Sequence, residues 1–350
     1  MSFGTEEIKF TQAIFQATSD ALNQNLDTFV IGLGVSYQNG ADGTMGDLGK
    51  RYPNRVLDTP VSEASLTGLA LGSAISGMRP IVHHGRVEFA LFAADQIITQ
   101  AAKWNYMFGG GYPAPIVFRI AIGRQWGNGP QHTQALYSLF GGVPGLKVVV
   151  PSTPFMAKGL LAAAVKDNNP VVFLEPRWLY QVKQDVPRET YFLSLVNSRM
   201  VREGKDFTVV TYGDGVIEAM NAADILSEIG IEIEVIDLVS INPIDYKLVQ
   251  SSVAKTKRLL TLDISNKAFS VGRSVIAEVS ATSSVGLLSA PIMIAAPDVP
   301  VPTATSLTEN YYPNRYSVVN SILSSYGRSP ILASLSFEEL HLPPAQKVNF

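Results

Sequence analysis

The feature that most constrains the fold is an alternation of short apolar runs with helical stretches along the chain. Runs at 27–35, 79–84 and 114–121 are short, apolar and rich in β-branched residues, as buried strands are. Apolar residues recur at helical spacing over 9–25, and the stretch 62–77 is small and apolar on almost every side, so we expect that helix to be buried all round. Strands that alternate with helices in this way predict a parallel sheet covered on both faces.

The alternation lapses into a polar stretch after residue 176 and then restarts, which indicates two α/β domains. With 46% hydrophobic residues in 350, the chain is long and apolar enough for two cores. We predict a first domain over 1–185, a linker over 186–200, a smaller second domain over 201–328 and a tail over 329–350. The predicted fold class is therefore α/β with two parallel-sheet domains.

Composition removes several classes of function. The 27 basic and 30 acidic side chains are spread along the chain and give a formal charge of −3, so we expect neither nucleic acid nor a membrane as a partner. The absence of cysteine excludes a disulfide framework, a thiolate zinc site and a cysteine nucleophile. The chain starts without a basic segment and an apolar stretch, and no run of about 18 apolar residues occurs, so we expect a cytoplasmic protein.

Two glycine motifs imitate nucleotide-binding sequences. Gly32 and Gly34 follow a predicted strand and begin a G-x-G-x-x-G pattern, but Tyr37 takes the third position and a long loop follows instead of a helix. The triplet 213–215, Gly-Asp-Gly, with the later Asn242, imitates the motif that holds Mg²⁺ and diphosphate in thiamin enzymes. Since glycine and aspartate are also the usual residues of tight turns, we favour a strand-to-helix turn there.

Glu63 is the most informative residue, because its carboxyl lies between a short strand and an almost wholly apolar helix. One interpretation is an acidic residue in the first helical turn, where the helix dipole favours negative charge. The other is a carboxyl in apolar surroundings that shares a proton with a ligand nitrogen. The residues around Glu63 decide between these interpretations.

Several stretches resemble the β subunit of the heterotetrameric E1 component of 2-oxo acid dehydrogenase complexes, which belongs to the transketolase-like superfamily. The resemblance covers roughly residues 8–328. The stretches that carry it are DTPVSEASLTGLALGSAISGMRPIV, FALFAADQIITQAAKWNYMFGG, PIVFR, GPQHTQALYSLFGGVPGLKVVVPSTPFMAKGLLAAAVKDNNPVVFLEP and VIDLVSINPID. It implies a pyrimidine-binding domain followed by a transketolase C-terminal-like domain.

The resemblance also implies a cofactor, thiamin diphosphate, and roles for three residues. In that family the glutamate matching Glu63 hydrogen-bonds N1′ of the aminopyrimidine and promotes loss of the C2 proton, which requires a carboxyl that shares its proton instead of losing it to water. Phe89 matches the aromatic residue that packs on the pyrimidine ring, and Gly85 lies in the same cofactor cleft. An α subunit supplies most of the Mg²⁺ and diphosphate site, so we expect an α2β2 heterotetramer.

The loop GNGPQHTQ carries a second catalytic candidate. His132 occupies a place where the family has a histidine near the substrate and the incoming acceptor, although a loop histidine is often only a surface residue. Arg119 and Arg124 flank the loop and could bind a substrate carboxylate through two hydrogen bonds. Arg119 matches the family, whereas Arg124 does not.

Shortly before Phe89, the chain departs from the family. Where these β subunits usually have Glu-Phe-Met, this sequence has His83, His84 and Gly85, followed by Arg86. Polar donors in a cleft need polar groups on a ligand, so we predict a polar 2-oxo acid or a sugar-like acceptor in place of a branched aliphatic one. The alternative is that both imidazoles face a subunit interface.

Four positions match those where some family members bind a structural K⁺ ion. Carbonyl oxygens supply most of that coordination, and carbonyl coordination leaves little imprint on the sequence. A helix end followed by an Asn-Pro turn explains the segment equally well. The four matching residues are Ile116, Ala164, Asp167 and Asn169.

The leading hypothesis is a β subunit that forms the active aldehyde from a 2-oxo acid and passes the acyl group to lipoamide on a lipoyl-bearing acyltransferase, E2. The alternative is half of a two-subunit carboligase or transketolase-like enzyme without a lipoyl complex. A non-catalytic assembly subunit and a generic nucleotide-binding protein are further alternatives. Glu63, Phe89 and His132 argue against the former, and the broken glycine motif argues against the latter.

Overall fold

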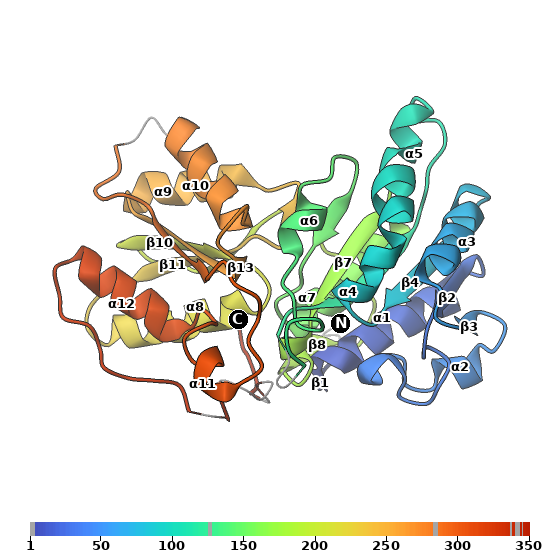
Figure 1. Ribbon diagram of the computed structural model, residues 1–350, viewed down its shortest axis with the longest axis horizontal. Coiled ribbons are helices and arrows are strands. Elements are labelled where there is room, and N and C mark those ends of the chain that lie inside the picture. The colour runs from blue at the N-terminus through green and yellow to red at the C-terminus, as the bar shows by residue number, and fades with distance from the viewer. Residues whose placement is uncertain (1–3, 125–127, 283–285, 337, 340–343, 345) are drawn as a thin grey trace. The chain divides into compact units, whose positions relative to one another are not determined.

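A computed structural model describes residues 4–124, 128–282, 286–336, 338–339, 344 and 346–350 (Figure 1). The chain divides into two compact units. Unit 1 contains the described residues of 1–122, 139–195 and 343–349, and unit 2 contains those of 123–138 and 196–342, with residue 350. None of the helices in the described part of the chain is long and apolar enough to span a membrane.

Unit 1 is built on a parallel sheet whose strands run in the order β6-β7-β5-β4-β2-β3. Every residue of β2, β5 and β7 is buried. Because alternate residues of a strand point to opposite faces, this sheet is covered on both sides, as the sequence predicts. The strands are β2 (Thr28–Gly32), β3 (Val56–Asp58), β4 (Arg79–His84), β5 (Val117–Ile122), β6 (Lys147–Val149) and β7 (Val171–Pro176).

A separate antiparallel pair joins β1 (Thr5–Lys9) to β8 (Lys183–Pro187) in unit 1. The sequence analysis placed no strand in either segment, because each is short and mixes polar with apolar residues. Short helical turns lie in the loops beside the main sheet, namely η1 (Ala41–Gly43), α2 (Leu48–Arg51) and η4 (Arg177–Leu179).

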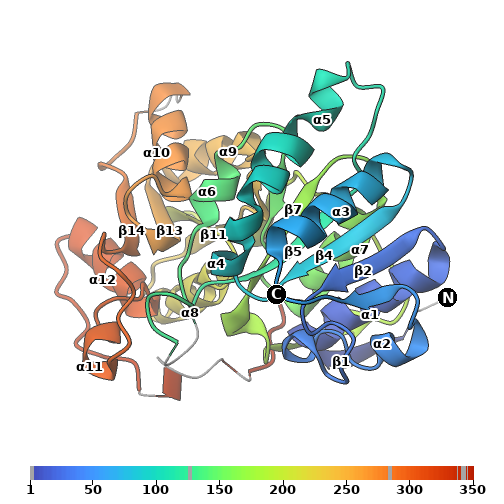
Figure 2. The ribbon, with the colours of Figure 1, turned by 45° about the vertical axis from the view of Figure 1, so that its right-hand side comes forward.

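The helices of unit 1 pack in two groups (Figures 1 and 2). Helix α1 (Phe10–Gln24) packs against α7 (Pro154–Lys166), and α3 (Glu63–Ile75) packs against the segment 87–107. The expectation that α3 is buried all round is wrong, because Leu69 is 58% exposed and lies on a stripe that no other described residue of the chain covers. Segment 87–107 is broken into α4 (Val87–Ala90), η2 (Leu91–Ala93), the π-helical η3 (Asp95–Ala101) and α5 (Ala102–Met107).

Unit 2 contains a second sheet with strand order β14-β13-β10-β11-β9, parallel except for β9 at one edge. A core of aliphatic side chains joins this sheet to α8 and α12, while α9 packs against α10. The strands of this sheet are β9 (Arg199–Arg202), β10 (Phe207–Thr211), β11 (Ile233–Asp237), β13 (Leu259–Asn266) and β14 (Ile292–Ala296). Unit 2 also contains the short strand β12 (Ser240–Asn242), which is not part of this sheet, and the helices α8 (Gly215–Ser227), α9 (Tyr246–Thr256), α10 (Val271–Thr282), α11 (Thr305–Thr308) and α12 (Arg315–Ser325).

The described residues of 123–138 follow β5 in the chain and pack with unit 2, although we expected this segment in the first domain. Helix α6 (Tyr137–Gly141) starts in unit 2 and carries the chain back. The phenol ring of Tyr137 meets that of Tyr212 edge to face, with 5.1 Å between ring centroids. This segment carries His132, so the second unit holds the loop that contains one of the two catalytic candidates.

Candidate functional site

The carboxyl ends of parallel strands lie along one edge of the unit 1 sheet, and this is where open α/β sheets bind ligands. Glu63 begins α3 shortly after β3 ends, and Phe89 follows the end of β4 in α4. Arg177 comes directly after β7. The topology therefore brings side chains that are far apart in the sequence to the same edge.

Glu63 has the properties of a ligand-binding carboxylate. It is half-buried, and it forms no hydrogen bond or ion pair with any residue that the structure describes. The N-terminus of α3 adds a favourable field for negative charge. Phe89 is half-buried too and offers part of its ring as an apolar surface. A carboxylate with unused acceptors and a partly open aromatic ring fit the aminopyrimidine of thiamin diphosphate, with Gly85 between β4 and α4.

His83 and His84 are buried at the end of β4, with 4% and 2% exposure. Burial lowers the pKa of His84 to about 4, and burial followed by the charge of Arg119 lowers the pKa of His83 well below its ordinary value. Both imidazoles are therefore neutral near pH 7. His84 Nε2 lies 3.3 Å from Thr67 Oγ1, whereas Nδ1 of each histidine has no hydrogen-bond partner among the described residues.

Arg119 is fully buried in β5, and its partner is Glu175 of β7. Arg119 Nε donates to Glu175 Oε1 at 2.6 Å, and Nη2 donates to Oε2 at 3.1 Å and to Thr44 Oγ1 at 2.9 Å. Tyr180 donates its hydroxyl to the same carboxylate at 3.0 Å. Glu175 occupies the Nε–Nη2 face of the guanidinium, and Thr44 shares Nη2, so Arg119 is a structural residue and not one of the proposed substrate contacts.

Arg177 belongs to this edge, and the sequence analysis missed it. Its Nη2 lies 2.9 Å from Asp42 Oδ2, and its Nε and Nη1 are buried without a hydrogen-bond partner. Leaving a buried donor unpaired costs about 1–3 kcal/mol. The available signal was a charged residue directly after a buried strand, since that position faces the binding edge of a parallel sheet.

Arg124 lies in unit 2 and is buried. Its Nε is 3.7 Å from Asp214 Oδ2, and its Nη2 is 3.8 Å from Glu218 Oε1. Burial raises the pKa of Asp214, and the charge of Arg124 opposes that rise. Arg124 thus ties its loop to the start of α8, so the Gly-Asp-Gly segment forms the strand-to-helix turn that we expected and also binds an arginine. His132 is half-buried in that loop, and its backbone N–H donates to Gly129 O at 3.3 Å.

The four candidate K⁺ ligands lie near one another at the end of α7, where protein donors already use them. The carbonyl of Ile116 accepts from Val171 N, and that of Ala164 accepts from Asp167 N. Asn105 donates to the Asn169 side chain at 2.6 Å.

Two positively charged side chains, Arg79 and Lys147, also contact acceptors at the end of α7. Arg79 Nη1 donates to Asp167 O at 3.0 Å and to Val165 O at 2.9 Å, and the Lys147 ammonium pairs with the Asp167 carboxylate. These groups compete with K⁺ for the same acceptors, so no step below depends on the ion. Among the described residues there is also no cluster of three or more histidines and carboxylates for a metal.

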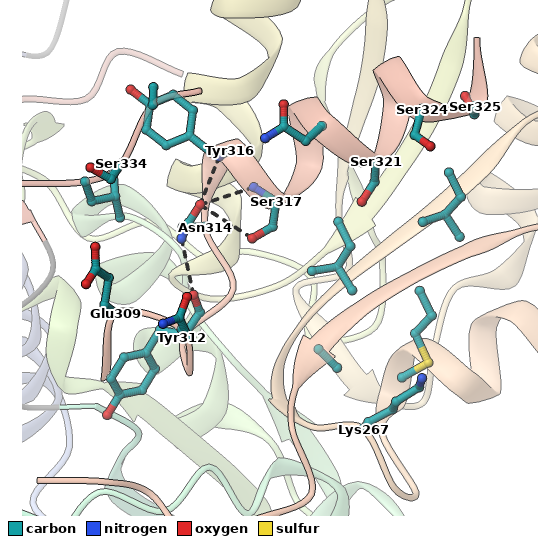
Figure 3. Close-up of a pocket in the computed structure, with 18 residues that line it drawn as sticks. Lys267, Glu309, Tyr312, Asn314, Tyr316, Ser317, Ser321, Ser324, Ser325 and Ser334 are labelled. Atoms are coloured by element: carbon teal, nitrogen blue, oxygen red, sulfur yellow. Dashed lines mark hydrogen bonds between the residues drawn. The ribbon is translucent and has the colours of Figure 1, made fainter. Parts of the chain in front are cut away.

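A cavity of about 950 Å³ lies in unit 2 between β14 and α12 (Figure 3). Asn314 caps α12 at its edge, accepting hydrogen bonds from the backbone of Tyr316 and Ser317. Serine and asparagine side chains dominate its helical wall. None of the predicted site residues lines this cavity.

Comparisons with known proteins agree with the fold. The pyrimidine-binding domain of transketolase matches residues 6–183, and its C-terminal domain matches residues 197–318. The chain is 38% identical over 313 residues to acetoin:2,6-dichlorophenolindophenol oxidoreductase subunit beta of Cupriavidus necator, covering 86% of this chain and 92% of that protein. It is 41% identical over 324 residues to pyruvate dehydrogenase E1 component subunit beta of Rhizobium meliloti, covering 91% and 70%. The human counterpart of the latter is 35% identical over 322 residues, with 90% of each chain covered.

A solved split-gene transketolase, an inactive β4 tetramer, shares the fold with a TM-score of 0.73 and 21% identity, covering 91% of this chain and 98% of that one. At that identity the likeness concerns the fold alone. The two matched domains and the relatives above 30% identity support the assignment of the chain to a family. The chain belongs to the β subunits of the E1 type, a thiamin-diphosphate-dependent enzyme family with transketolase pyrimidine-binding and C-terminal domains.

Proposed function

We propose that this chain holds the aminopyrimidine of thiamin diphosphate in a two-subunit enzyme that forms an active aldehyde from a 2-oxo acid. The observation that carries the proposal is the Glu63 carboxylate, which is half-buried and has no partner in the described chain. Such a group can share a proton with a ring nitrogen. Bound thiamin diphosphate supplies a carbanion that adds to the carbonyl of the substrate.

The remaining roles belong to side chains of this chain. Glu63 holds a proton at N1′, and the Phe89 ring packs against the aminopyrimidine. His132 is the candidate group for moving a proton near the substrate during acyl transfer. An α subunit completes the enzyme, which the β-subunit names of the relatives support. We assign to that subunit most of the Mg²⁺ and diphosphate contacts, as the family resemblance implies.

For the substrate we propose a polar 2-oxo acid, with lipoamide on an E2 acyltransferase as the acceptor. The unpaired Nδ1 atoms of His83 and His84 support this preference, because a branched aliphatic substrate would leave them without partners. The second candidate is an enzyme that works outside a lipoyl complex. It is favoured by the Cupriavidus necator relative, whose name gives acetoin and a dye as its reactants.

The test is Glu63→Gln in the complex of this chain with the α subunit that co-purifies with it. The amide has nearly the same shape but cannot exchange the proton, so C2 hydrogen–deuterium exchange of the bound cofactor should slow about 10² to 10⁴-fold. Glu189→Gln, an exposed change in the same unit, is the control and should leave exchange unchanged. Normal exchange in the Glu63 variant would return this residue to a helix-dipole role.

A further inference from the structure

We propose that Arg177 receives a second anionic group of the substrate, a carboxylate or a phosphate, and that Asp42 holds the arginine until this group arrives. The proposal rests on the proposed function, since it names the substrate class of the same sheet edge. It concerns a position where the chain places a guanidinium directly after β7.

Arg177 uses only part of the hydrogen-bonding capacity of its guanidinium group. A guanidinium offers two faces that can bind an oxyanion through two bonds: Nε with Nη2, and Nη1 with Nη2. Asp42 contacts Nη2 alone, the nitrogen common to both faces, at 2.9 Å. Nε and Nη1 are buried and unpaired, and the side chain is 7% exposed. An incoming oxyanion that takes Nη2 with either neighbour can therefore form two hydrogen bonds in place of the single ion-pair contact with Asp42.

Arg119 shows by contrast what a structural arginine looks like at this edge. Its Nε and Nη2 both bind Glu175, Thr44 shares Nη2, and its Nη1 lies 3.7 Å from the sulfur of Met45. No such set of acceptors surrounds Arg177 among the described residues. The difference between the two buried arginines points to an acceptor that this chain does not supply.

The neighbours of Arg177 favour an anion over a neutral group. Burial and then the positive charge of Arg177 lower the pKa of Arg86, while Asp42 and Glu88 oppose this shift, so the guanidinium groups of Arg86 and Arg177 lie within electrostatic range of each other. His83 lies within electrostatic range of Arg177 as well, and its Nδ1 is unpaired. Being neutral, His83 can offer a hydrogen bond without repelling the arginines.

The position of the Asp42 side chain allows it to separate from Arg177 when a ligand binds. Its side chain is 42% exposed, and it belongs to η1, where it has a φ of 56°. Ala41 has a φ of 51°, so two successive non-glycine residues hold the left-handed conformation that they rarely adopt. Water can solvate the Asp42 carboxylate once a ligand displaces it, so displacement buries no unpaired charge.

The test is isothermal titration of the full chain with inorganic phosphate and, separately, with malonate as a two-carboxylate probe. We expect at least one of them to bind, and Arg177→Gln to weaken that binding by about tenfold or more. Asp42→Asn, which removes the competing carboxylate, should tighten it by about three- to tenfold. Arg188→Gln, at a mostly exposed arginine of the same unit, should change nothing.

The opposite effects of the two variants distinguish ligand exchange from a purely structural contact. If Arg177 and Asp42 only stabilise each other, Asp42→Asn leaves binding unchanged or weaker, and the proposal fails. It also fails if neither anion binds the wild-type chain. Phosphate binding without malonate binding identifies a phosphorylated substrate, and the reverse identifies a dicarboxylic one. Should Arg177→Gln not fold, as a thermal melt would show, the Asp42 variant still decides.

Anion binding needs neither cofactor nor turnover, so it is measured independently of the cofactor exchange experiment on Glu63. Either experiment can therefore contradict its own proposal without contradicting the other. A second measurement links the site to catalysis in the assembled enzyme. Arg177→Gln should raise KM for an anionic substrate and leave C2 exchange of the cofactor at the wild-type rate. Slower exchange in this variant would indicate a disturbed cofactor site instead.

Discussion

Replacing Arg119 by methionine should destabilise unit 1 strongly, because it would leave a fully buried carboxylate almost alone. Glu175 would lose two charge-assisted hydrogen bonds, at 2.6 and 3.1 Å, and keep only the Tyr180 hydroxyl at 3.0 Å. Arg119 and Glu175 have fully buried side chains, so water cannot compensate. Breaking one partner of such a pair costs about 3–5 kcal/mol.

The pair must be tested as a cycle of variants. Arg119→Met and Glu175→Met together should cost much less than Arg119→Met alone, because methionines of similar volume replace a desolvated pair without leaving a charge. Urea unfolding followed by circular dichroism measures the free energies, with the unit 1 transition fitted separately if two transitions occur. If Arg119→Met stays within about 1 kcal/mol of wild type while KM rises, Arg119 binds substrate, and our structural interpretation is refuted.

Four further outcomes are expected. His132→Ala should slow acyl transfer to the natural acceptor more than decarboxylation with an artificial electron acceptor; equal small effects on both would make this histidine a bystander. The chain purified alone should show no robust turnover with thiamin diphosphate and Mg²⁺, and activity without a second subunit would exclude the two-chain proposal. The assembled enzyme should have a higher kcat/KM for a hydroxylated 2-oxo acid than for 2-oxoisovalerate, and the reverse order would refute the polar-substrate argument. Because burial depresses the pKa of His84 in the folded state to about 4, its stabilising contribution is complete above pH 6.5 and is lost as the pH falls. The free energy of unfolding of wild type relative to His84→Phe should therefore drop by about 3 kcal/mol between pH 7 and 4. A constant difference would mean that His84 titrates normally.

Local patterns were sufficient to predict the main sheet and the helices around it. The buried strand at 79–84 and the helix that starts at Glu63 follow from apolar spacing within short windows. Local patterns were not sufficient to predict β8. This segment forms a strand only because it pairs with β1, which lies more than 170 residues away in the sequence. Pairing over such a distance leaves no local period.

The site shows the same division. Glu63 could be singled out as a candidate from the sequence, although its neighbours alone left a helix-dipole role open and the family resemblance was needed to choose between the two. The structural role of Arg119 could not be predicted from its neighbours in the sequence, because its partners Glu175 and Thr44 belong to another strand and a loop. Arg177 was missed for the same reason: its unpaired nitrogens become visible only when every acceptor around them is placed in space. Sequence identifies charged groups, whereas pairing decides which of them are left for a ligand.

The double crossing of the chain between the two units restricts how such a gene can be rearranged. Segment 123–138 needs Asp214 and Tyr212 of unit 2, yet β5 before it and β6 after it belong to unit 1. A gene cut at the linker would give a first polypeptide whose inner loop lacks its packing surface. A different C-terminal domain must therefore also provide partners for Arg124 and Tyr137, so we expect the loop that carries His132 to pack properly only with a matching second domain.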